Sequence, residues 1–412
     1  MKKKCFVCGS KFKDYLSLGK QPCADTFIKN KLKSKNLKKF PLVVAFCKCS
    51  HLTATYPVPP HTRYEKYDYS YTSSNSPVSR LHFKTIAKQI CKSFKIKNNS
   101  LIIEAGSNDG SFLSEVKKLS NSNILGVDPS KNISKIANKK KINTYVGYFN
   151  FKNSKKIKQK YGLANVFYGA NVFNHVDDNI DFLNGAYNIL KKDGVLVLEV
   201  PDLQSLVQKV GFDTIYHEHR HYYSEKSLFN ILKKNRFFVF KIKKIPYMAG
   251  SIRVYAKKSP NNLFDRSKLT QVSLTEFKTF KKKINSILIH IKNFVEINLH
   301  KNKKIYGIGA ATKGNTLLNC CNFDSTKISA ILEKSVHKIN KYTPGSAIKI
   351  IHEDKINNME AAIILPWNIS SYLKKKLLKN KKIPYISISK LVKNKNIWKK
   401  NLKLYTKIIE EK

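Results

Sequence analysis

The sequence contains no apolar run that approaches the length of a membrane span, so no transmembrane helix is expected. Its N-terminus, MKKKCFVCGS, has basic residues but no apolar core, which argues against a secretory signal. We therefore expect a soluble, cytoplasmic protein without a membrane partner. The length of 412 residues suggests roughly two or three domains, and 42% hydrophobic residues are enough to give each of them a core.

Acidic residues are scarce: 78 Lys and Arg stand against 27 Asp and Glu, which gives a net charge of +51. Such an excess can indicate binding to nucleic acid or to a membrane surface. Here lysine is spread over nearly every segment, Ile, Asn, Phe and Tyr are also abundant, and no separate basic tail stands out. We interpret the charge as a coding bias that could also attract an anionic small substrate, and we expect no nucleic-acid partner.

Cysteines are also few, with eight in the chain, and their clustering does not suit a secreted disulfide scaffold. Cys5 and Cys8 form a CxxC pair, and Cys47 and Cys49 form a CxC pair after a long loop. Four thiolates in two close pairs predict a tetrahedral structural zinc site, which would stabilise a small N-terminal unit. Because CxC is a tight spacing for two ligands, His51 or Cys23 could replace one of them. The alternative to a metal site is free cysteines packed as small apolar residues.

The dinucleotide-binding pattern G-x-G-x-x-G is missing, yet residues 101–113, LIIEAGSNDGSFL, have a related organisation. An apolar β-type run ends at Glu104, a turn from Gly106 to Gly110 follows, and Ser111 opens an expected helix. Such a strand, turn and helix form a nucleotide-sized pocket at the carboxyl edge of an α/β sheet. The next expected strand ends at Asp128, whose carboxylate can accept hydrogen bonds from two ribose hydroxyls. A dinucleotide-binding oxidoreductase is the nearest structural alternative.

Apolar runs alternate with helical patterns along the middle of the chain, which predicts a parallel sheet with right-handed crossovers. A helix is expected at about 78–94, and two late strands, 237–245 and 251–257, should form an antiparallel hairpin that closes the sheet. The expected parallel strands are 101–106, 124–129, 144–147, 165–171 and 194–200.

The last third of the chain repeats this organisation on a smaller scale. A long helix or a broken pair is expected at about 265–300, followed by a strand, a glycine turn and a helix over 304–315. The turn and Lys313 suit a phosphate-bearing ligand, or else form a purely structural connection. Further strands are expected at 328–332, 361–366 and 384–388. The predicted domains cover residues 1–62, 63–262 and 263–412.

Histidines number only 11, but three of them alternate around a glutamate in the stretch 216–224, YHEHRHYYS. Histidine can act as a base near neutral pH, and we expect the neighbouring carboxylate to orient it and raise its basicity. The alternatives are an H-x-H-x-H metal site and a structural polar cluster at a strand end. The tyrosine-rich stretch 64–76, YEKYDYSYTSSNS, could line a polar ligand site or form an ordered aromatic loop.

Taken in order, these pieces resemble the sugar C-methyltransferases, enzymes that use S-adenosylmethionine (AdoMet) to methylate nucleotide-linked ketosugars in deoxysugar biosynthesis. The resemblance covers almost the whole chain and rests on LGKQPCADTF (18–27), YSYTSSNS (69–76), EAGSNDGSFL (104–113), GVDPS (126–130), NVFNHVDD (171–178), YHEHRHYYS (216–224), GSIRVY (250–255), GIGAATKGNTLLN (307–319), PGS (344–346) and LPWN (365–368). It implies a class I AdoMet methyltransferase domain, an α/β (Rossmann-like) fold, between a small N-terminal zinc-binding unit and a second, smaller C-terminal α/β domain. In that family the C-terminal domain helps to hold the nucleotide sugar.

The resemblance also implies roles for particular residues. The implied catalytic residues are His219 as the base, with Glu218, Tyr216, His175, Tyr71 and Tyr69. The implied AdoMet-binding residues are Glu104, Gly106, Asn108, Asp109, Asp128, Pro129 and Asn171. The base would remove a proton from the carbon beside the keto group, and the resulting enolate would be methylated. The chain departs from the family at the CxC pair and at Met248-Ala249, where a His-Gly pair is usual.

Other activities fit parts of the pattern. O-methylation of a related sugar would need the same base. The charge and the zinc unit would suit an RNA methyltransferase, although the sequence has no N-P-P-Y motif. A catalytically inactive nucleotide-sugar-binding protein is the non-enzymatic alternative. Both a monomer and a homodimer are compatible with the sequence.

Overall fold

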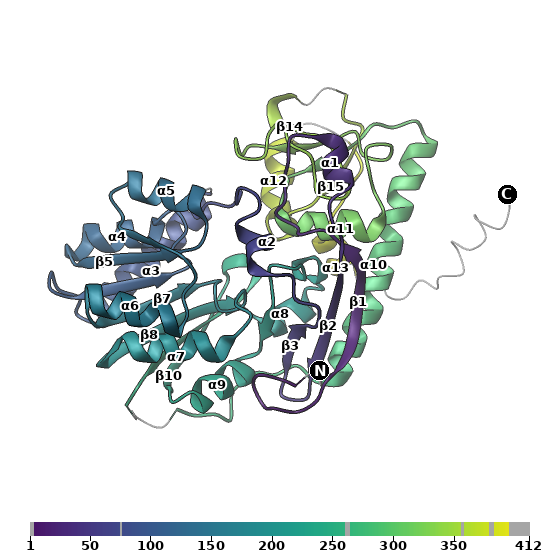
Figure 1. Ribbon diagram of the computed structural model, residues 1–412. Coiled ribbons are helices and arrows are strands. Elements are labelled where there is room, and N and C mark those ends of the chain that lie inside the picture. The colour runs from purple at the N-terminus through teal and green to yellow at the C-terminus, as the bar shows by residue number, and fades with distance from the viewer. Residues whose placement is uncertain (1–3, 75, 260–263, 356–357, 379–382, 395–412) are drawn as a thin grey trace.

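The computed structural model describes residues 4–74, 76–259, 264–355, 358–378 and 383–394, which form three β-sheets with flanking helices (Figure 1). The central sheet lies in one lobe, and the C-terminal sheet lies in the other, beside the long helix α10 (Leu274–His300). The N-terminal sheet also lies alongside α10. No helix in the described ranges is long and apolar enough to cross a membrane.

The central sheet has seven strands in the order β10-β11-β8-β7-β4-β5-β6. Its strands are β4 (Leu101–Ala105), β5 (Asn123–Asp128), β6 (Thr144–Val146), β7 (Ala164–Ala170), β8 (Leu190–Pro201), β10 (Phe238–Ile245) and β11 (Ser251–Lys257). Strands β4, β5, β6, β7 and β8 are parallel to one another, and β11 runs antiparallel to both β8 and β10. The predicted parallel sheet and its closing hairpin are therefore confirmed.

Helices cover both faces of this sheet, because β4, β7 and most of β8 are apolar runs buried on both sides. The helices are α3 (Pro77–Ser93), α4 (Ser111–Ser120), α5 (Lys131–Lys139), α6 (Phe151–Tyr161), α7 (Asn179–Ile189), α8 (Leu203–Gln208) and α9 (Glu225–Lys234). Local chemistry sets several of their starts: the Asp178 side chain caps α7 and the Asp202 side chain caps α8.

The N-terminal sheet is antiparallel, with the order β1-β2-β3-β9. Its first strands are β1 (Lys13–Gln21), β2 (Phe40–Cys47) and β3 (His51–Ala54), and the short helices α1 (Lys31–Lys35) and α2 (Pro60–Tyr64) accompany them. The fourth strand, β9 (His221–Tyr223), belongs to the histidine-rich block in the middle of the chain. The N-terminal unit therefore obtains its last strand from the segment that carries the candidate base.

The C-terminal sheet is parallel, with the order β14-β13-β12-β15-β16. It consists of β12 (Ile305–Ile308), β13 (Ala330–Glu333), β14 (Ile350–His352), β15 (Ala361–Ile364) and β16 (Tyr385–Ile386), with helices α11 (Thr312–Cys321), α12 (Ser370–Leu377) and α13 (Ile388–Lys393). The predicted second α/β unit is thus present, with β14 as an additional strand. The long helix α10 is a single helix that begins with a capping box between Ser273 and Glu276.

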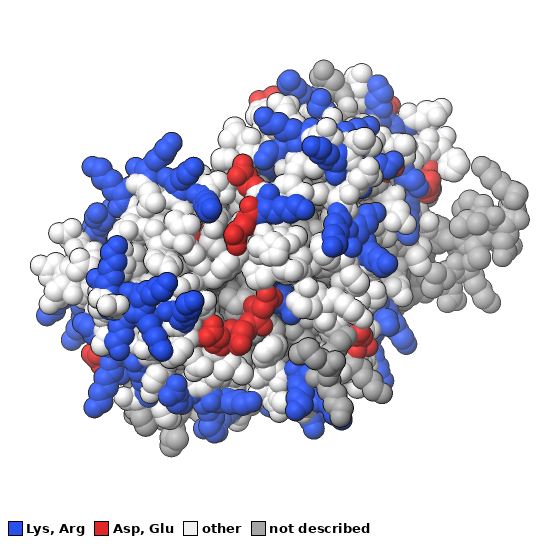
Figure 2. All heavy atoms as spheres, viewed as in Figure 1, with Lys and Arg blue, Asp and Glu red and all other residues white. Residues whose placement is uncertain are grey.

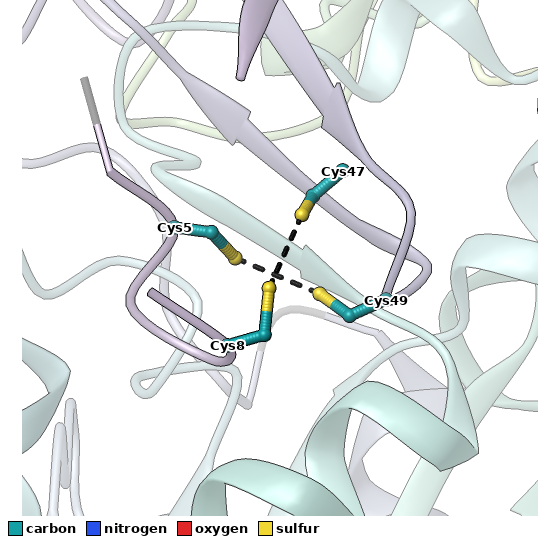
Figure 3. Close-up of side chains that lie close together, drawn as sticks. All are labelled: Cys5, Cys8, Cys47 and Cys49. Atoms are coloured by element: carbon teal, nitrogen blue, oxygen red, sulfur yellow. Dashed lines mark hydrogen bonds between the residues drawn. The ribbon is translucent and has the colours of Figure 1, made fainter. Parts of the chain in front are cut away.

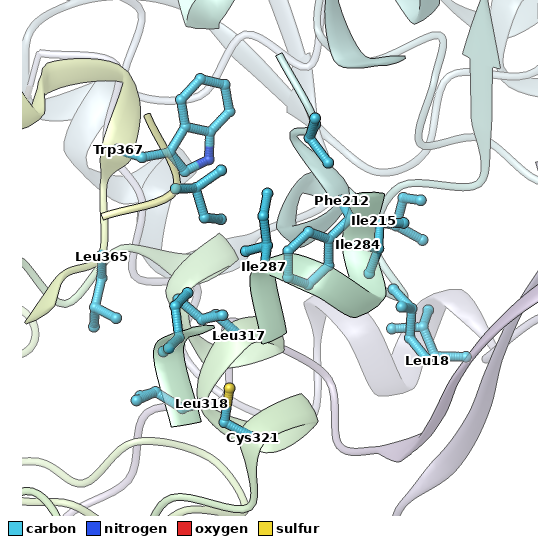
Figure 4. Packing of buried hydrophobic residues seen from close by; sticks show 14 of the residues in the cluster. Leu18, Phe212, Ile215, Ile284, Ile287, Leu317, Leu318, Cys321, Leu365 and Trp367 are labelled. Carbon is cyan, nitrogen blue, oxygen red and sulfur yellow. The ribbon is translucent and has the colours of Figure 1, made fainter. Parts of the chain in front are cut away.

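One apolar cluster joins the N-terminal sheet, α10 and the C-terminal unit (Figure 4). In it, Phe46 of β2 stacks on Phe277 of α10 with ring centroids 4.6 Å apart. The same cluster includes Ile215 from the chain before β9 and Leu317 from α11. The N-terminal and C-terminal sheets therefore share one core, and the domain limits given above stay a prediction.

Surface charge is widely distributed. Figure 2 shows Lys and Arg side chains over most of the visible face, while Asp and Glu side chains gather where the two lobes meet. On this face the excess of lysine does not form one isolated basic patch, in agreement with its even spread along the sequence.

Candidate active site

The glycine turn after β4 brings the predicted nucleotide-binding residues to the carboxyl edge of the central sheet. Gly106 has a φ of +64°, a left-handed conformation that glycine adopts without strain. The Asp128 carboxylate at the end of β5 accepts hydrogen bonds from the backbone N–H groups of Asn108 (2.9 Å) and Ser130 (2.9 Å). These bonds leave further lone pairs on the two carboxylate oxygens, which is what two ribose hydroxyls would require.

Glu104 is the next-to-last residue of β4, beside this turn, and is 3% exposed. Burial raises the pKa of its carboxyl group well above the ordinary value, and the nearby Asp109 and Asp128 raise it further. One carboxylate oxygen, Oε2, has no hydrogen-bond partner among the described residues. A buried oxygen without a partner is costly, so Glu104 fits a cofactor that brings its own hydrogen-bond donor.

The remaining predicted cofactor residues divide into two kinds. Pro129 and Asn171 are half-buried at the same edge of the sheet, where Asn171 adopts a φ of +52° directly after β7. Asn108 instead accepts from the N–H of Ser73 (2.8 Å), and the Asp109 carboxylate binds Lys140 (3.1 Å) and the Ser74 hydroxyl. Asn108 and Asp109 thus fasten the tyrosine loop, residues 64–76, to the glycine turn.

His219 is held in one tautomer by two neighbours. Its Nδ1–H donates to the carbonyl oxygen of Thr214 (2.8 Å), so its Nε2 is unprotonated and accepts from the Tyr216 hydroxyl (2.8 Å). Burial lowers the pKa of His219 to about 4, which keeps the imidazole neutral at pH 7. A neutral imidazole with Nε2 as an acceptor has the protonation state that a general base needs.

A second tyrosine–histidine pair faces the first. The Tyr64 hydroxyl lies 2.8 Å from Nδ1 of His175, and the two imidazole rings stand nearly perpendicular with centroids 4.7 Å apart. Burial, with His219 and the Arg63 guanidinium nearby, holds the pKa of His175 well below its ordinary value. The structure therefore brings the two predicted histidines together, and it adds Tyr64, which the sequence indicated only as the start of an aromatic stretch.

Glu218 does not orient His219, so this expectation is wrong. Its carboxylate accepts hydrogen bonds from the backbone N–H groups of Asp25 (3.0 Å) and Ala24 (3.4 Å). Burial, with Asp25 nearby, raises the pKa of Glu218 to about 7. The orienting group for His219 is the carbonyl of Thr214. Residues 216–219 form a turn closed by a bond from the His219 N–H to the Tyr216 carbonyl (2.9 Å), and the Glu218 carboxylate in this turn binds the 24–25 backbone instead.

The H-x-H-x-H metal site is not formed among the described residues, where the four cysteines are the group of potential ligands that lies close enough to hold an ion. His217 contacts the carbonyl of Gln21 (3.1 Å) and His221 contacts the hydroxyl of Thr53 (3.1 Å), whereas His219 contacts Thr214.

The predicted tyrosines of the loop occupy different surroundings. Tyr69 packs edge-on against Tyr64 with ring centroids 5.9 Å apart, which places it beside the histidine pair. Tyr71 instead interacts with Tyr247 and Ser79. Burial raises the pKa of both Tyr69 and Tyr71 well above the ordinary value, so both hydroxyls stay protonated and can donate hydrogen bonds.

The four predicted cysteines converge on one point, as Figure 3 shows. Their sulfur atoms all lie within 4.8 Å of one another, with Cys5 3.6 Å from Cys49 and Cys8 3.4 Å from Cys47. A tetrahedral site with Zn–S bonds of about 2.3 Å has S–S edges of about 3.8 Å, so the cluster could hold a metal ion. His51 lies 3.3 Å from the Cys5 sulfur as an additional neighbour, while Cys23 lies outside the cluster.

Comparisons with known proteins agree with this organisation. Residues 81–240 match a family model described as a methyltransferase domain, and residues 247–382 match one described as a C-methyltransferase C-terminal domain. The C-methyltransferase NovU of Streptomyces niveus is 27% identical over 378 residues, which are 88% of this chain and 89% of that protein.

Solved structures of methyltransferases are similar to part of this chain. A SAM-dependent methyltransferase from Archaeoglobus fulgidus is 19% identical and covers 43% of this chain and 94% of its own, with a TM-score of 0.35. Magnesium protoporphyrin IX methyltransferase from Synechocystis PCC 6803 is 13% identical and covers 44% of this chain and 79% of its own, with a TM-score of 0.33. The strand order and the family models confirm the predicted class I fold, with its N-terminal four-cysteine unit and its separate C-terminal parallel sheet.

Proposed function

Because the chain belongs to the C-methyltransferase family and is an AdoMet-dependent methyltransferase, we propose that it methylates a carbon beside the keto group of a nucleotide-linked sugar. The observation that carries this proposal is the pair formed by Tyr216 and His219, in which a neutral imidazole is oriented by Thr214. Abstraction of a C–H proton needs such a base, and the keto group acidifies the neighbouring carbon.

The cofactor would bind at the carboxyl edge of the central sheet. Asp128 would hold its ribose hydroxyls, Glu104 would accept from its amino group, and the turn at Gly106 would approach it closely. When bound, AdoMet supplies an electrophilic methyl group. The protein then has to position the two reactants and exclude water.

His219 would take the proton from the sugar carbon onto Nε2. The Tyr216 hydroxyl that occupies Nε2 would turn to the enolate oxygen, so one motion would free the base and stabilise the developing charge. His175 would stand beside His219 as the second imidazole of the site, with the Tyr64 hydroxyl at its Nδ1.

The four-cysteine cluster would hold a structural zinc ion, since a set of four cysteine ligands is typical of structural zinc sites. The substrate class is supported by the resemblance of the sequence blocks to the sugar C-methyltransferases and by the second glycine turn with Lys313 in the C-terminal unit.

The test is to incubate the protein with AdoMet and a panel of nucleotide-linked 4-ketosugars and to measure the gain of one methylene by mass spectrometry. His219→Asn should abolish turnover while AdoMet binding by calorimetry is unchanged. His217→Asn is the matched control, because His217 is also buried and its imidazole lies against Gln21 and Phe40 of the N-terminal unit. Turnover that survives in His219→Asn would remove this histidine from the role of base, and an O-methyl product by NMR would show that a hydroxyl is the nucleophile.

A further inference from the structure

One face of α11 carries three polar side chains that bond outside the C-terminal unit. Thr312, Asn315 and Thr316 have the spacing i, i+3, i+4 and so lie on the same side of the helix. The Thr312 hydroxyl donates to the Asp25 carboxylate (2.8 Å), and the Asn315 side-chain amide donates to the carbonyl of Ala24 (2.7 Å). The Thr316 hydroxyl donates to the carbonyl of Ile215 (3.3 Å).

The first partner, Asp25, connects α11 to the tyrosine loop. Its carboxylate accepts from the backbone N–H of Ser70 (2.9 Å) and from the Ser70 hydroxyl (2.8 Å). Ser70 lies between Tyr69 and Tyr71 in the sequence. A displacement of Thr312 would therefore be transmitted to the tyrosine loop by the carboxylate of Asp25, a residue that is only 6% exposed.

The second partner, Ala24, connects α11 to the histidine-rich block. The backbone N–H groups of Ala24 and Asp25 are the donors to Glu218, which directly precedes His219. Asn315 is 2% exposed, so its bond to the Ala24 carbonyl has no competition from bulk water.

The third partner, Ile215, follows the residue that orients the base. The carbonyl of Thr214 holds His219, and the carbonyl of Ile215 accepts from Thr316. The C-terminal unit contacts the segment 213–215 at a second point, where Trp367 donates its indole N–H to the Asp213 carboxylate (2.8 Å). Figure 4 shows Ile215, Leu317 and Trp367 in the same packed region.

We propose that the polar face of α11, formed by Thr312, Asn315 and Thr316, is the device by which the C-terminal domain positions the tyrosine loop and the base. The three bonds end on two segments. Ala24 and Asp25 bond onward to Ser70 and Glu218, the neighbours of Tyr69 and His219, and Ile215 directly follows Thr214. Their meaning for catalysis rests on the proposed function, because it assumes that His219 is the base. Thr312, Asn315 and Thr316 are accordingly positioning residues.

The experiment compares Thr312→Val and Thr316→Val with Thr312→Ser and Thr316→Ser, which keep the hydroxyl. Amide hydrogen–deuterium exchange of peptides from 64–76 and 212–223 should rise about tenfold in the matching valine variant, since one buried hydrogen bond is lost, and should return toward wild type in the serine variant. Thr312→Val should affect 64–76 first, and Thr316→Val should affect 212–223 first.

Kinetics provide the second readout. With a 4-ketosugar substrate, kcat should fall about tenfold in each valine variant while the Kd for AdoMet stays near wild type, because neither threonine bonds to Glu104, Gly106 or Asp128. The control is Asn319→Ala on the same helix. Asn319 donates to the carbonyl of Pro344 (3.0 Å) inside the C-terminal unit, so its loss should leave exchange in both segments and kcat near wild type.

Unchanged exchange in both segments of the valine variants would overturn the proposal, whatever the activity. So would an increase spread over the whole chain that Asn319→Ala reproduces, because α11 would then contribute only general stability. Failure of wild type to methylate any ketosugar would refute the proposed function, and the exchange measurement would still decide whether α11 positions these segments.

Discussion

The base His219 should stay active at a pH at which an ordinary histidine has become protonated. Its imidazole is 7% exposed, and this burial lowers its pKa to about 4 from the ordinary 6.5. At about pH 5.5 a histidine of ordinary pKa is roughly 10% neutral, whereas His219 would be more than roughly 95% neutral. At that pH we therefore expect kcat/KM to be about tenfold higher than it would be with a base of ordinary pKa.

The assay is the initial rate of S-adenosylhomocysteine formation between about pH 5 and pH 8.5, at constant ionic strength and with the ketosugar well below its KM. Glu218, with a pKa raised to about 7, could add an inflection of its own. Glu218→Gln removes that group and should leave a profile that is flat down to about pH 5. A profile that falls to half near pH 6.5 in both wild type and Glu218→Gln would refute the assignment of a buried, neutral base.

The lowered pKa of His219 also makes the stability of the fold depend on pH. Between pH 4 and 6.5 the unfolded chain protonates this histidine and the folded protein does not, so the free energy of unfolding falls as the pH falls through this window. A shift from 6.5 to about 4 corresponds to about 3 kcal/mol. The difference in unfolding free energy between wild type and His219→Asn should shrink by that order from pH 7.5 to 4, as measured by urea unfolding. A difference that does not change with pH would contradict the burial argument.

Three further outcomes are expected. Tyr216→Phe should lower kcat about tenfold, because one hydrogen bond to the base and to the enolate is lost, and an unchanged kcat would exclude Tyr216 from the reaction. Asp128→Ala should raise the Kd for AdoMet about 30-fold in calorimetry, since two ribose hydrogen bonds disappear, and a Kd within about twofold of wild type would argue against the ribose contact. Cys47→Ser should lose the bound metal by mass spectrometry and lower the thermal midpoint, whereas Cys91→Ser, outside the cluster, should keep both; equal metal content in the two variants would mean that the four cysteines do not bind it.

The sequence predicted those elements whose signal is local. Strand β4 is a continuous apolar run that ends at a glycine turn, and the four cysteines needed only their spacing to indicate a common site. Strand β14 has three residues, too few for a period to stand out. Strand β9 could not be predicted as part of the N-terminal sheet, because its partner β3 lies about 170 residues earlier and nothing in either strand specifies the other.

At the candidate site, too, the local features were predictable from the sequence and the long-range contacts were not. The residue types at the site were apparent from the histidine-rich block and from the acids at the ends of β4 and β5. Their partners were not, because hydrogen bonds such as Tyr64 to His175 and Thr316 to Ile215 join segments that are distant in the sequence. The expectation for Glu218 was wrong for a related reason: nearness in sequence suggested a contact with His219, whereas the carboxylate binds the backbone N–H of Asp25, 193 residues earlier.

The tight CxC spacing has a structural explanation that connects the cysteine cluster to the base. Cys47 is the last residue of β2 and His51 is the first of β3, so Cys49 lies in the turn of a hairpin that is closed by a bond from the Ser50 N–H to the Cys47 carbonyl (2.9 Å). The hairpin, not the sequence spacing, points both sulfur atoms toward Cys5 and Cys8. On its other side β3 pairs with β9, which begins two residues after His219. An ion in the cluster would therefore stabilise β9 through β3. The base would then be supported by the N-terminal unit through β9 and by the C-terminal unit through α11, which gives a reason for a class I methyltransferase domain to carry both.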